Sequence, residues 1–157
     1  MREIERDIVA AVIISKDNKI LLGKKHADSG GVYIDCWHIP GGGVDNDLDL
    51  KSAIIREILE ETGIDITDSI IKLLDDKGKG QSEKILPETQ EKVICKMHFN
   101  VFKVNLGQKS NEVELKLDDD LAELKWVSIE DMEKMKLTPP SIELFSRIKI
   151  SSLLNNS

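Results

Sequence analysis

Apolar residues lie along this chain in short unbroken runs or in alternation with polar residues, and both patterns are typical of β-strands. Ile8–Ile14 is an unbroken, mostly β-branched run, which predicts a strand buried on both faces. Lys19–Leu22 predicts a second strand and Leu121–Val127 a later one. From Val93 to Val101 every second residue is apolar, which predicts a strand with one face in the core and the other toward solvent.

Residues 49–62 have the periodicity of an α-helix instead. Asp47 or Asp49 can cap the first turn, because a short acidic side chain accepts hydrogen bonds from the free backbone N–H groups there. Gly63 is placed to end the last turn in a left-handed conformation. The pattern therefore predicts one strong internal helix.

The remaining segments complete the predicted fold. Residues 64–74 resemble one or two short strands, and residues 75–92, which are rich in Gly, Lys, Asp and Glu, predict a mobile polar loop or a hairpin tip. Further helices are expected from Ser128 and over residues 138 to about 154. With no repeat or linker in sequence, the expectation is one α+β domain over residues 1–157, with a sheet between helices.

The composition narrows the classes of function. The chain has 157 residues, of which 40% are apolar, and a formal charge of −7, which argues against binding to a nucleic acid polymer. Cys36 and Cys95 are too few and too far apart for a disulfide framework or a zinc site, so they predict core thiols in a reducing compartment. Without a signal peptide or membrane span, we expect a cytoplasmic protein with no membrane partner.

Three acidic residues of the predicted helix, Glu57, Glu60 and Glu61, follow an i, i+3, i+4 spacing and so share one face. Like charges this close destabilise a helix unless a cation offsets them. Carboxylate oxygens without histidine or cysteine suit Mg²⁺, or Mn²⁺, better than zinc. The competing interpretation is a plain solvated surface, since acidic helix faces are common.

The run Gly41-Gly42-Gly43 stands just before this helix and follows Pro40, and we expect the proline and glycines to end any strand there. Glycines let the backbone approach a bulky ligand closely, and a following helix N-terminus favours phosphate, although a glycine run is often only a turn. Phosphate beside three carboxylates requires bridging metal ions. Together the two features indicate metal-assisted attack of water on a phosphoryl group.

At these residues the sequence resembles the Nudix hydrolase superfamily. Gly42 and the segment Arg56-Glu57-Ile58-Leu59-Glu60-Glu61-Thr62-Gly63-Ile64 match its signature, and Trp37-His38-Ile39-Pro40-Gly41 resembles its usual lead-in. The one departure is Leu48, where the pattern has a glutamate, and Asp47 or Asp49 could supply that carboxylate instead. The resemblance implies an α/β/α sandwich with a mixed sheet and one catalytic helix after a Gly-rich loop.

The resemblance also implies roles for individual residues. Glu57, Glu60 and Glu61 would be the metal ligands, with Glu60 and Glu61 also catalytic, and Arg56 would orient a glutamate. Binding of the metal or the substrate would further involve backbone oxygen of Gly41 or Gly42 and a lysine, Lys24 or Lys25, at a substrate phosphate. Each lysine is also consistent with an ordinary surface residue.

The general base is the least determined role. Glu60 is the first choice, and each alternative is also consistent with a solvated surface acid: Glu83, Glu88, Glu91 and Asp120. Three further side chains could line a substrate pocket but are equally consistent with scaffold positions: His98, Trp37 and Trp126.

The substrate follows only by elimination. The chain lacks the markers of the Nudix branches that cleave ADP-ribose, diadenosine polyphosphates, coenzyme A and NADH, so it most resembles the small MutT-type group. That resemblance implies hydrolysis of a nucleoside triphosphate to monophosphate and pyrophosphate, with a small nucleotide as the partner. A pyrophosphatase for nucleotide sugars or other nucleoside diphosphate derivatives stays open, as do a non-catalytic module that senses nucleotide or metal and assembly as a homodimer.

Overall fold

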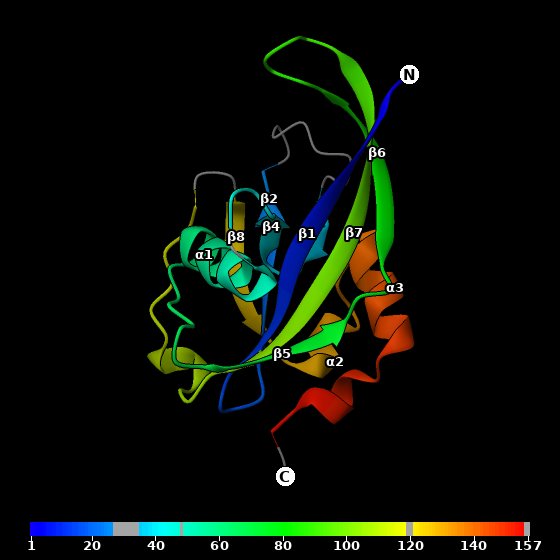
Figure 1. Ribbon diagram of the computed structural model, residues 1–157. Helices are drawn as coiled ribbons and strands as arrows, with labels where there is room; N and C mark the ends of the chain where they lie inside the picture. The colour runs from blue at the N-terminus through cyan, green and yellow to red at the C-terminus, as the bar shows by residue number, and fades with distance from the viewer. Residues whose placement is uncertain (27–34, 48, 119–120, 156–157) are drawn as a thin grey trace.

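The computed structural model describes residues 1–26, 35–47, 49–118 and 121–155 of the chain. Within these residues one mixed sheet of eight strands runs through the molecule (Figure 1). Its strands are β1 (Glu3–Ile14), β2 (Ile20–Lys25), β3 (Trp37–His38), β4 (Gly41–Gly43), β5 (Ile70–Asp75), β6 (Lys79–Ile85), β7 (Lys92–Asn105) and β8 (Leu121–Val127). The helices are α1 (Leu50–Thr62), α2 (Ile129–Met132) and α3 (Pro139–Arg147), with 3₁₀ turns at Ser110–Glu112 and Ile150–Leu153.

The centre of the sheet is the parallel pair β1 and β7, which stay in register from Glu3 opposite Ile94 to Ile14 opposite Asn105. The other strands pair antiparallel: β2 and β4 with β1, β5 and β6 with β7, and β3 and β8 with β2. In Figure 1 the β6–β7 hairpin extends past the body of the molecule, near the N-terminus. β1 and β7 are both longer than the runs that predict them.

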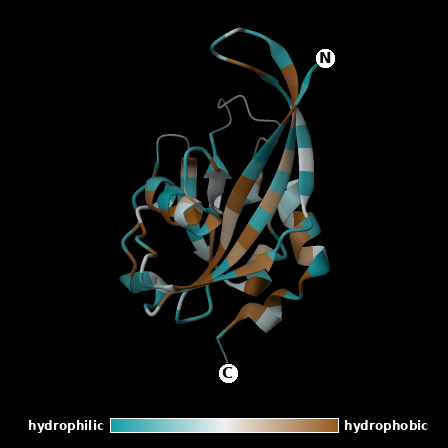
Figure 2. Ribbon diagram, viewed as in Figure 1, coloured by the Kyte–Doolittle hydropathy of each residue, from teal (hydrophilic) through white to brown (hydrophobic). Residues whose placement is uncertain are grey.

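Helices cover both faces of the sheet, as the alternation of side chains along β1 requires. Val9, Ala11 and Ile13 belong to the core cluster that includes Ile54 and Ile58 of α1. The alternate residues Ala10, Val12 and Ile14 pack in a second cluster with Met132 of α2 and Leu144 of α3. Figure 2 shows apolar and polar residues alternating along the central strands. The predicted α/β/α sandwich with a mixed sheet is confirmed.

Two sequence predictions were wrong, and the structure makes two others more exact. Gly41–Gly43 was expected to end any strand, yet it forms β4, in register with Ile8–Ala10 of β1. The last helix was expected to reach about Leu154, but α3 stops at Arg147, because Ile148 adopts extended dihedrals of φ −121° and ψ 123°. Of residues 64–74, only the part from Ile70 is a strand. Residues 75–92 contain β6 as well as the hairpin tip.

Among the described residues, no helix is both long and apolar enough to span a membrane.

Candidate active site

Local sequence signals fix both ends of α1. The Asp49 carboxylate accepts a hydrogen bond from the Ser52 backbone N–H at 2.7 Å and so caps the first turn. Gly63, at φ 80°, ends the helix in the left-handed region and donates its N–H to the Leu59 carbonyl. The apolar side of α1 is buried against the sheet, which leaves its arginine and three glutamates beside β4.

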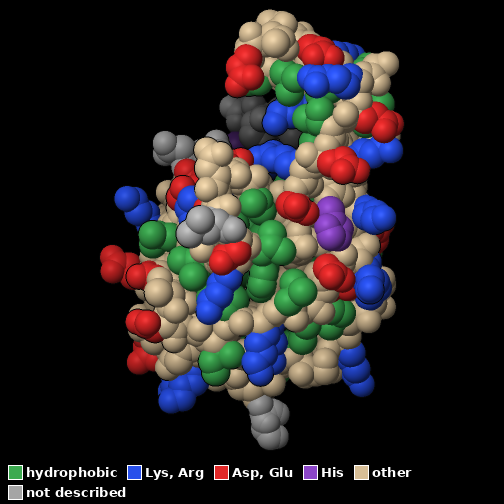
Figure 3. All heavy atoms as spheres, viewed as in Figure 1, with side chains coloured by type: hydrophobic (Ala, Val, Ile, Leu, Met, Phe, Trp, Pro, Cys, Tyr) green, Lys and Arg blue, Asp and Glu red, His purple; other side chains and the backbone are tan. Residues whose placement is uncertain are grey.

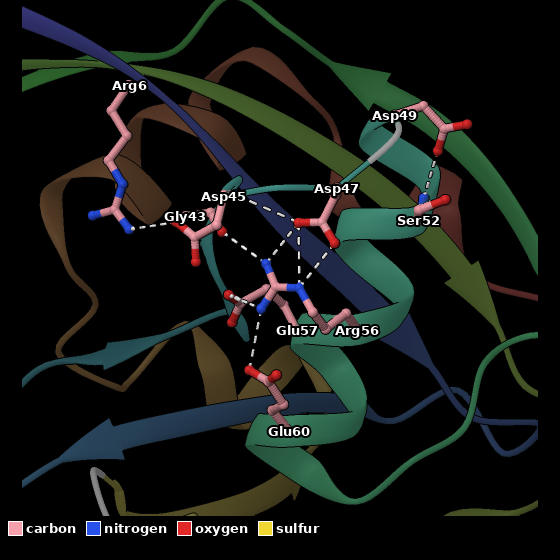
Figure 4. A network of polar contacts seen from close by, with 9 residues as sticks. All are labelled: Arg6, Gly43, Asp45, Asp47, Asp49, Ser52, Arg56, Glu57 and Glu60. Atoms are coloured by element: carbon pink, nitrogen blue, oxygen red, sulfur yellow. Dashed lines mark hydrogen bonds and ion pairs between the residues drawn. The ribbon is translucent and has the colours of Figure 1, made fainter.

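Arg56 is the centre of the polar network in Figure 4. Its guanidinium donates to Asp47 through Nε at 2.9 Å and Nη2 at 2.8 Å, and to the Gly43 carbonyl through Nη2 at 3.1 Å. On the other side, Nη1 donates to Glu57 at 3.0 Å and to Glu60 at 3.2 Å. The guanidinium therefore holds two of the three predicted metal ligands in place and ties them to β4.

The structure separates the two acids that flank position 48. Asp47 binds Arg56, and that arginine holds the pKa of the Asp47 carboxyl below its usual range. Asp49 is committed to the helix cap instead. Leu48 itself lies outside the described residues.

Neighbouring atoms lie close to all three glycines of β4. A Cβ on Gly42 would overlap the Glu57 carboxylate, and one on Gly41 would overlap the Val9 carbonyl of β1. A Cβ on Gly43 would overlap the guanidinium of Arg6. Backbone contact thus requires glycine at position 41, while Gly42 and Gly43 leave room for the side chains of Glu57 and Arg6.

Among the acids of α1, Glu61 has the most strongly shifted pKa. Burial raises the pKa of Glu61 to about 8, a hydrogen bond from the Gly41 backbone opposes that change, and the neighbouring Glu57 adds to it. Burial also raises the pKa of Glu57, against the opposing effect of Arg56. Glu61 Oε1 is buried and has no hydrogen-bond partner among the described residues. A carboxylate in this position needs a positive partner.

A cavity of about 350 Å³ opens beside β4, between β1, β7 and α3. Gly41, Gly42 and Lys25 all line it, so the three predicted binding residues lie together. Its floor is apolar and includes Ile8, Phe99, Val101 and Leu144. Lys24 is directed elsewhere, with Nζ 3.2 Å from Asp35 and 5.5 Å from the centre of the Trp37 ring.

The NUDIX domain family model matches residues 5–148. The chain belongs to the Nudix family. An RNA pyrophosphohydrolase of Pelagibacter ubique (strain HTCC1062) is 29% identical over 133 residues, which cover 81% of this chain and 78% of the relative. A CTP pyrophosphohydrolase of Escherichia coli (strain K12) is 41% identical over 59 residues, covering 38% of this chain and 42% of that relative. Among solved structures, a MutT protein from Methanosarcina mazei Go1 aligns with a TM-score of 0.62 and 28% identity over 94% of each chain.

With these relatives, the chain is a Nudix pyrophosphohydrolase, an enzyme that acts on phosphoric anhydrides. Nudix hydrolases generally use divalent metals such as Mg²⁺. The donor set fits such an ion, because Glu57, Glu60 and Glu61 offer only hard carboxylate oxygens and Glu61 Oε1 lacks a partner within the described residues. No group of three acidic, histidine or cysteine side chains in the described part of the chain is already gathered as a cage. A divalent metal ion would therefore compete with Arg56 for the carboxylate oxygens of Glu57 and Glu60.

The alternative bases lie away from this Nudix helix. Glu83 pairs with Lys92 and Glu91 with Arg2 along the β6–β7 hairpin, and Glu88 lies in its tip. Asp120 lies outside the described residues.

Two side chains that the sequence offered as pocket residues, His98 and Trp126, do not line the cavity. The His98 ring lies 3.3 Å from Asp7 on the opposite face of the sheet from the cavity floor. Trp126 packs against the core beneath α1.

Most residues that line the cavity were not predicted from sequence, and two basic ones lie next to β4. His38 lines it, with Nδ1 against the Ile39 carbonyl at 2.9 Å and a pKa that burial lowers. Arg6 lines it from β1. Neither carries a local signal, since both depend on how β3 and β4 fold back over β1 and β2.

Proposed function

We propose that this Nudix enzyme is an Mg²⁺-dependent hydrolase that converts a nucleoside triphosphate to monophosphate and pyrophosphate, and that one Nudix domain spans the chain. The observation that carries the proposal is the meeting of two features at β4. The acidic face of α1 abuts Gly42, and the apolar cavity lined by Gly41, Gly42 and Lys25 opens beside the same strand. A cavity of about 350 Å³ with an apolar floor suits a nucleoside rather than a polymer.

In this proposal each side chain has a defined task. Glu57, Glu60 and Glu61 hold the ion, with backbone oxygen from Gly41 or Gly42 completing the set. When bound, Mg²⁺ supplies Lewis acidity and lowers the pKa of a coordinated water. Arg56 orients Glu57 and Glu60 through its two Nη1 hydrogen bonds. Lys25 receives a substrate phosphate at the cavity wall.

Glu60 is the proposed general base. Its side chain is 58% exposed, so water reaches it, whereas Glu61 is only partly exposed and its Oε1 is buried. A base must reach both the attacking water and bulk solvent to pass on the proton. Among the acids considered, Glu60 alone combines contact with Arg56 and this exposure.

The names of the relatives point to two different substrates, a free nucleotide and RNA. The CTP pyrophosphohydrolase supports the triphosphate proposal, while the RNA pyrophosphohydrolase covers more of the chain. A net charge of −7 disfavours an RNA polymer, and Figure 3 shows acidic and basic side chains interspersed on the face it presents. A nucleotide sugar remains the second small-molecule candidate.

The test is product analysis by chromatography. The enzyme is incubated with nucleoside triphosphates, oxidised purine triphosphates, nucleotide sugars, dinucleotides and 5′-triphosphorylated RNA, with and without Mg²⁺. Metal-dependent monophosphate plus pyrophosphate from a free nucleotide is the expected result. A sugar phosphate would favour the nucleotide-sugar alternative, and pyrophosphate released only from RNA would replace the proposed substrate.

Variants test the residue roles in the same assay. Glu60→Gln and Glu61→Gln are expected to lower turnover by orders of magnitude while the circular dichroism spectrum stays unchanged. Glu83→Gln is the matched control, because Glu83 lies on the hairpin and pairs with Lys92. Near wild-type turnover in both helix variants contradicts the assignment. Mg²⁺ binding without turnover of any substrate would favour the sensing module.

A further inference from the structure

Two arginines line the cavity, and Arg6 is held more loosely by the described residues than Arg147 is. Arg147 donates to Asp75 through Nε at 3.2 Å and Nη2 at 2.7 Å, and the Asp75 side chain is only 7% exposed. Within the described residues Arg6 has a single ion pair, to Asp45 at 3.7 Å, and the Asp45 side chain is 63% exposed. A long pair to an exposed carboxylate contributes little to stability. The donors of Arg6 are therefore available to a ligand.

The position of this guanidinium is defined by Gly43. Ile8 of β1 lies opposite Gly43 of β4, so Arg6, two residues earlier on the same face of β1, extends over that glycine. A Cβ at position 43 would overlap the guanidinium. In Figure 4, Arg6 and Arg56 approach Gly43 and Asp45 from opposite sides. Arg56 is occupied by acids and by the Gly43 carbonyl, whereas Arg6 faces the cavity.

Arg6 and Lys25 flank the glycine strand. β4 pairs with β1, which carries Arg6, while Lys25 ends β2 on the other side (Figure 1). Both cations line the same cavity as Gly41 and Gly42. A phosphate chain lying across β4 would thus meet one cation on each side. The acidic face of α1 would lie beneath it.

We propose that Arg6 binds non-bridging oxygens of the substrate's polyphosphate on the cavity side of β4, opposite Lys25. This inference rests on the proposed function and names a residue that the family signature does not contain. The planar guanidinium can donate two parallel hydrogen bonds to one phosphate group, which an ammonium cannot. Arg6 is therefore a determinant of affinity for the phosphate chain rather than for the base.

A merely structural role makes a different prediction. If Arg6 only covers Gly43 and pairs with Asp45, its loss lowers the melting temperature, and Asp45→Asn lowers it in the same way. If Arg6 binds substrate, Arg6→Gln raises KM, and Asp45→Asn leaves KM unchanged or lowers it by releasing the guanidinium. The two roles thus differ in both KM and melting temperature.

The experiment compares wild type with Arg6→Gln, Arg6→Lys, Asp45→Asn and Arg2→Gln. Arg2 is the matched control, since it pairs with Glu91 at the far end of the hairpin and does not line the cavity. KM and kcat are measured for ATP and CTP with Mg²⁺, and affinity for the α,β-methylene analogues is measured by calorimetry. Melting temperature is recorded for each variant.

Arg6→Gln is expected to raise KM and the analogue dissociation constant by about tenfold or more, the effect of losing a hydrogen-bonded charge, with kcat changed far less. Arg6→Lys should lie between it and wild type, and Arg2→Gln should match wild type. An unchanged KM in a folded Arg6→Gln chain overturns the inference. If that variant does not fold, a wild-type KM in Arg6→Lys overturns it. Lack of wild-type turnover on every nucleotide would instead contradict the proposed function.

Discussion

The Asp47 carboxylate accepts two hydrogen bonds from the Arg56 guanidinium, with Oδ1 2.9 Å from Nε and Oδ2 2.8 Å from Nη2. The Asp47 side chain is only 10% exposed and that of Arg56 is 30% exposed, so the pair is partly shielded from water. In the Nudix pattern the position after Asp47 is a glutamate that supports the metal site or pairs with the arginine, and here it is Leu48. A carboxylate one residue earlier thus contacts the arginine in this chain.

Asp47→Asn should therefore weaken the site without unfolding the chain. The amide cannot neutralise the guanidinium, so Arg56 would pair more strongly with Glu57 and Glu60 and compete with Mg²⁺. We expect turnover and Mg²⁺ affinity to fall by about tenfold, in line with the loss of one charge-assisted pair. Kinetics over a range of Mg²⁺ concentrations, with direct Mg²⁺ titration by calorimetry, measure both effects.

Two further variants control this prediction. Asp49→Ala removes the helix cap, which should cost about 1 kcal/mol of unfolding free energy but leave turnover close to wild type. Adding Leu48→Glu to Asp47→Asn restores the carboxylate of the Nudix pattern and should recover activity. Equal activity of Asp47→Asn and wild type would show that the ion pair does not support the site.

Sequence alone predicted α1 well, because periodicity, the Asp49 cap and Gly63 all act within one segment. The role of the β4 glycines could not be predicted in the same way. Proline and glycine are local signals for a turn, but Gly41–Gly43 is a strand because its backbone pairs with β1 and its missing side chains admit Glu57 and Arg6. Those contacts join segments far apart in sequence, so no local pattern reports them.

The same limit applies to the site residues. The i, i+3, i+4 spacing was enough to gather Glu57, Glu60 and Glu61 on one face. How far each one is exposed depends on the strands packed against the helix, so no local pattern distinguishes Glu61, whose Oε1 is buried, from the exposed Glu60. Arg6 lies at the start of β1 and becomes a cavity residue only through β4.

Gly42→Ala should damage the acidic face directly, because the new methyl group would overlap the Glu57 carboxylate. Glu57 must then move, so we expect a loss of turnover of at least about tenfold together with weaker Mg²⁺ binding. Gly107→Ala is the control, since nothing lies within 4 Å of a Cβ there. Similar losses in both variants would indicate a general effect of glycine replacement rather than a steric one at the site.

Glu61 should make the metal-free enzyme less stable as pH rises. Its pKa is about 8 in the folded chain against 4.5 as the ordinary value, so the folded state retains a proton that the unfolded state releases. The contribution of Glu61 to the free energy of unfolding is therefore fully present below about pH 4.5 and is lost as the pH rises toward 8. Melting temperatures in EDTA from pH 5 to 8 should fall more steeply for wild type than for Glu61→Gln. Parallel profiles for the two proteins would contradict this burial effect.

The ion pair between Asp75 and Arg147 should anchor α3 to the end of β5 and so form one wall of the cavity. Asp75→Asn is expected to lower the unfolding free energy by about 1–3 kcal/mol, because it leaves a partly buried guanidinium without its counter-charge. Arg147 lowers the pKa of Asp75, so this stability is present above about pH 4 and is lost as the pH falls further. Urea unfolding at pH 7 and at lower pH measures both effects. Asp76→Asn, at a half-exposed neighbour with only a 3.9 Å pair to Lys77, should leave stability unchanged. If the two variants were equally stable, α3 would be held by its apolar contacts alone.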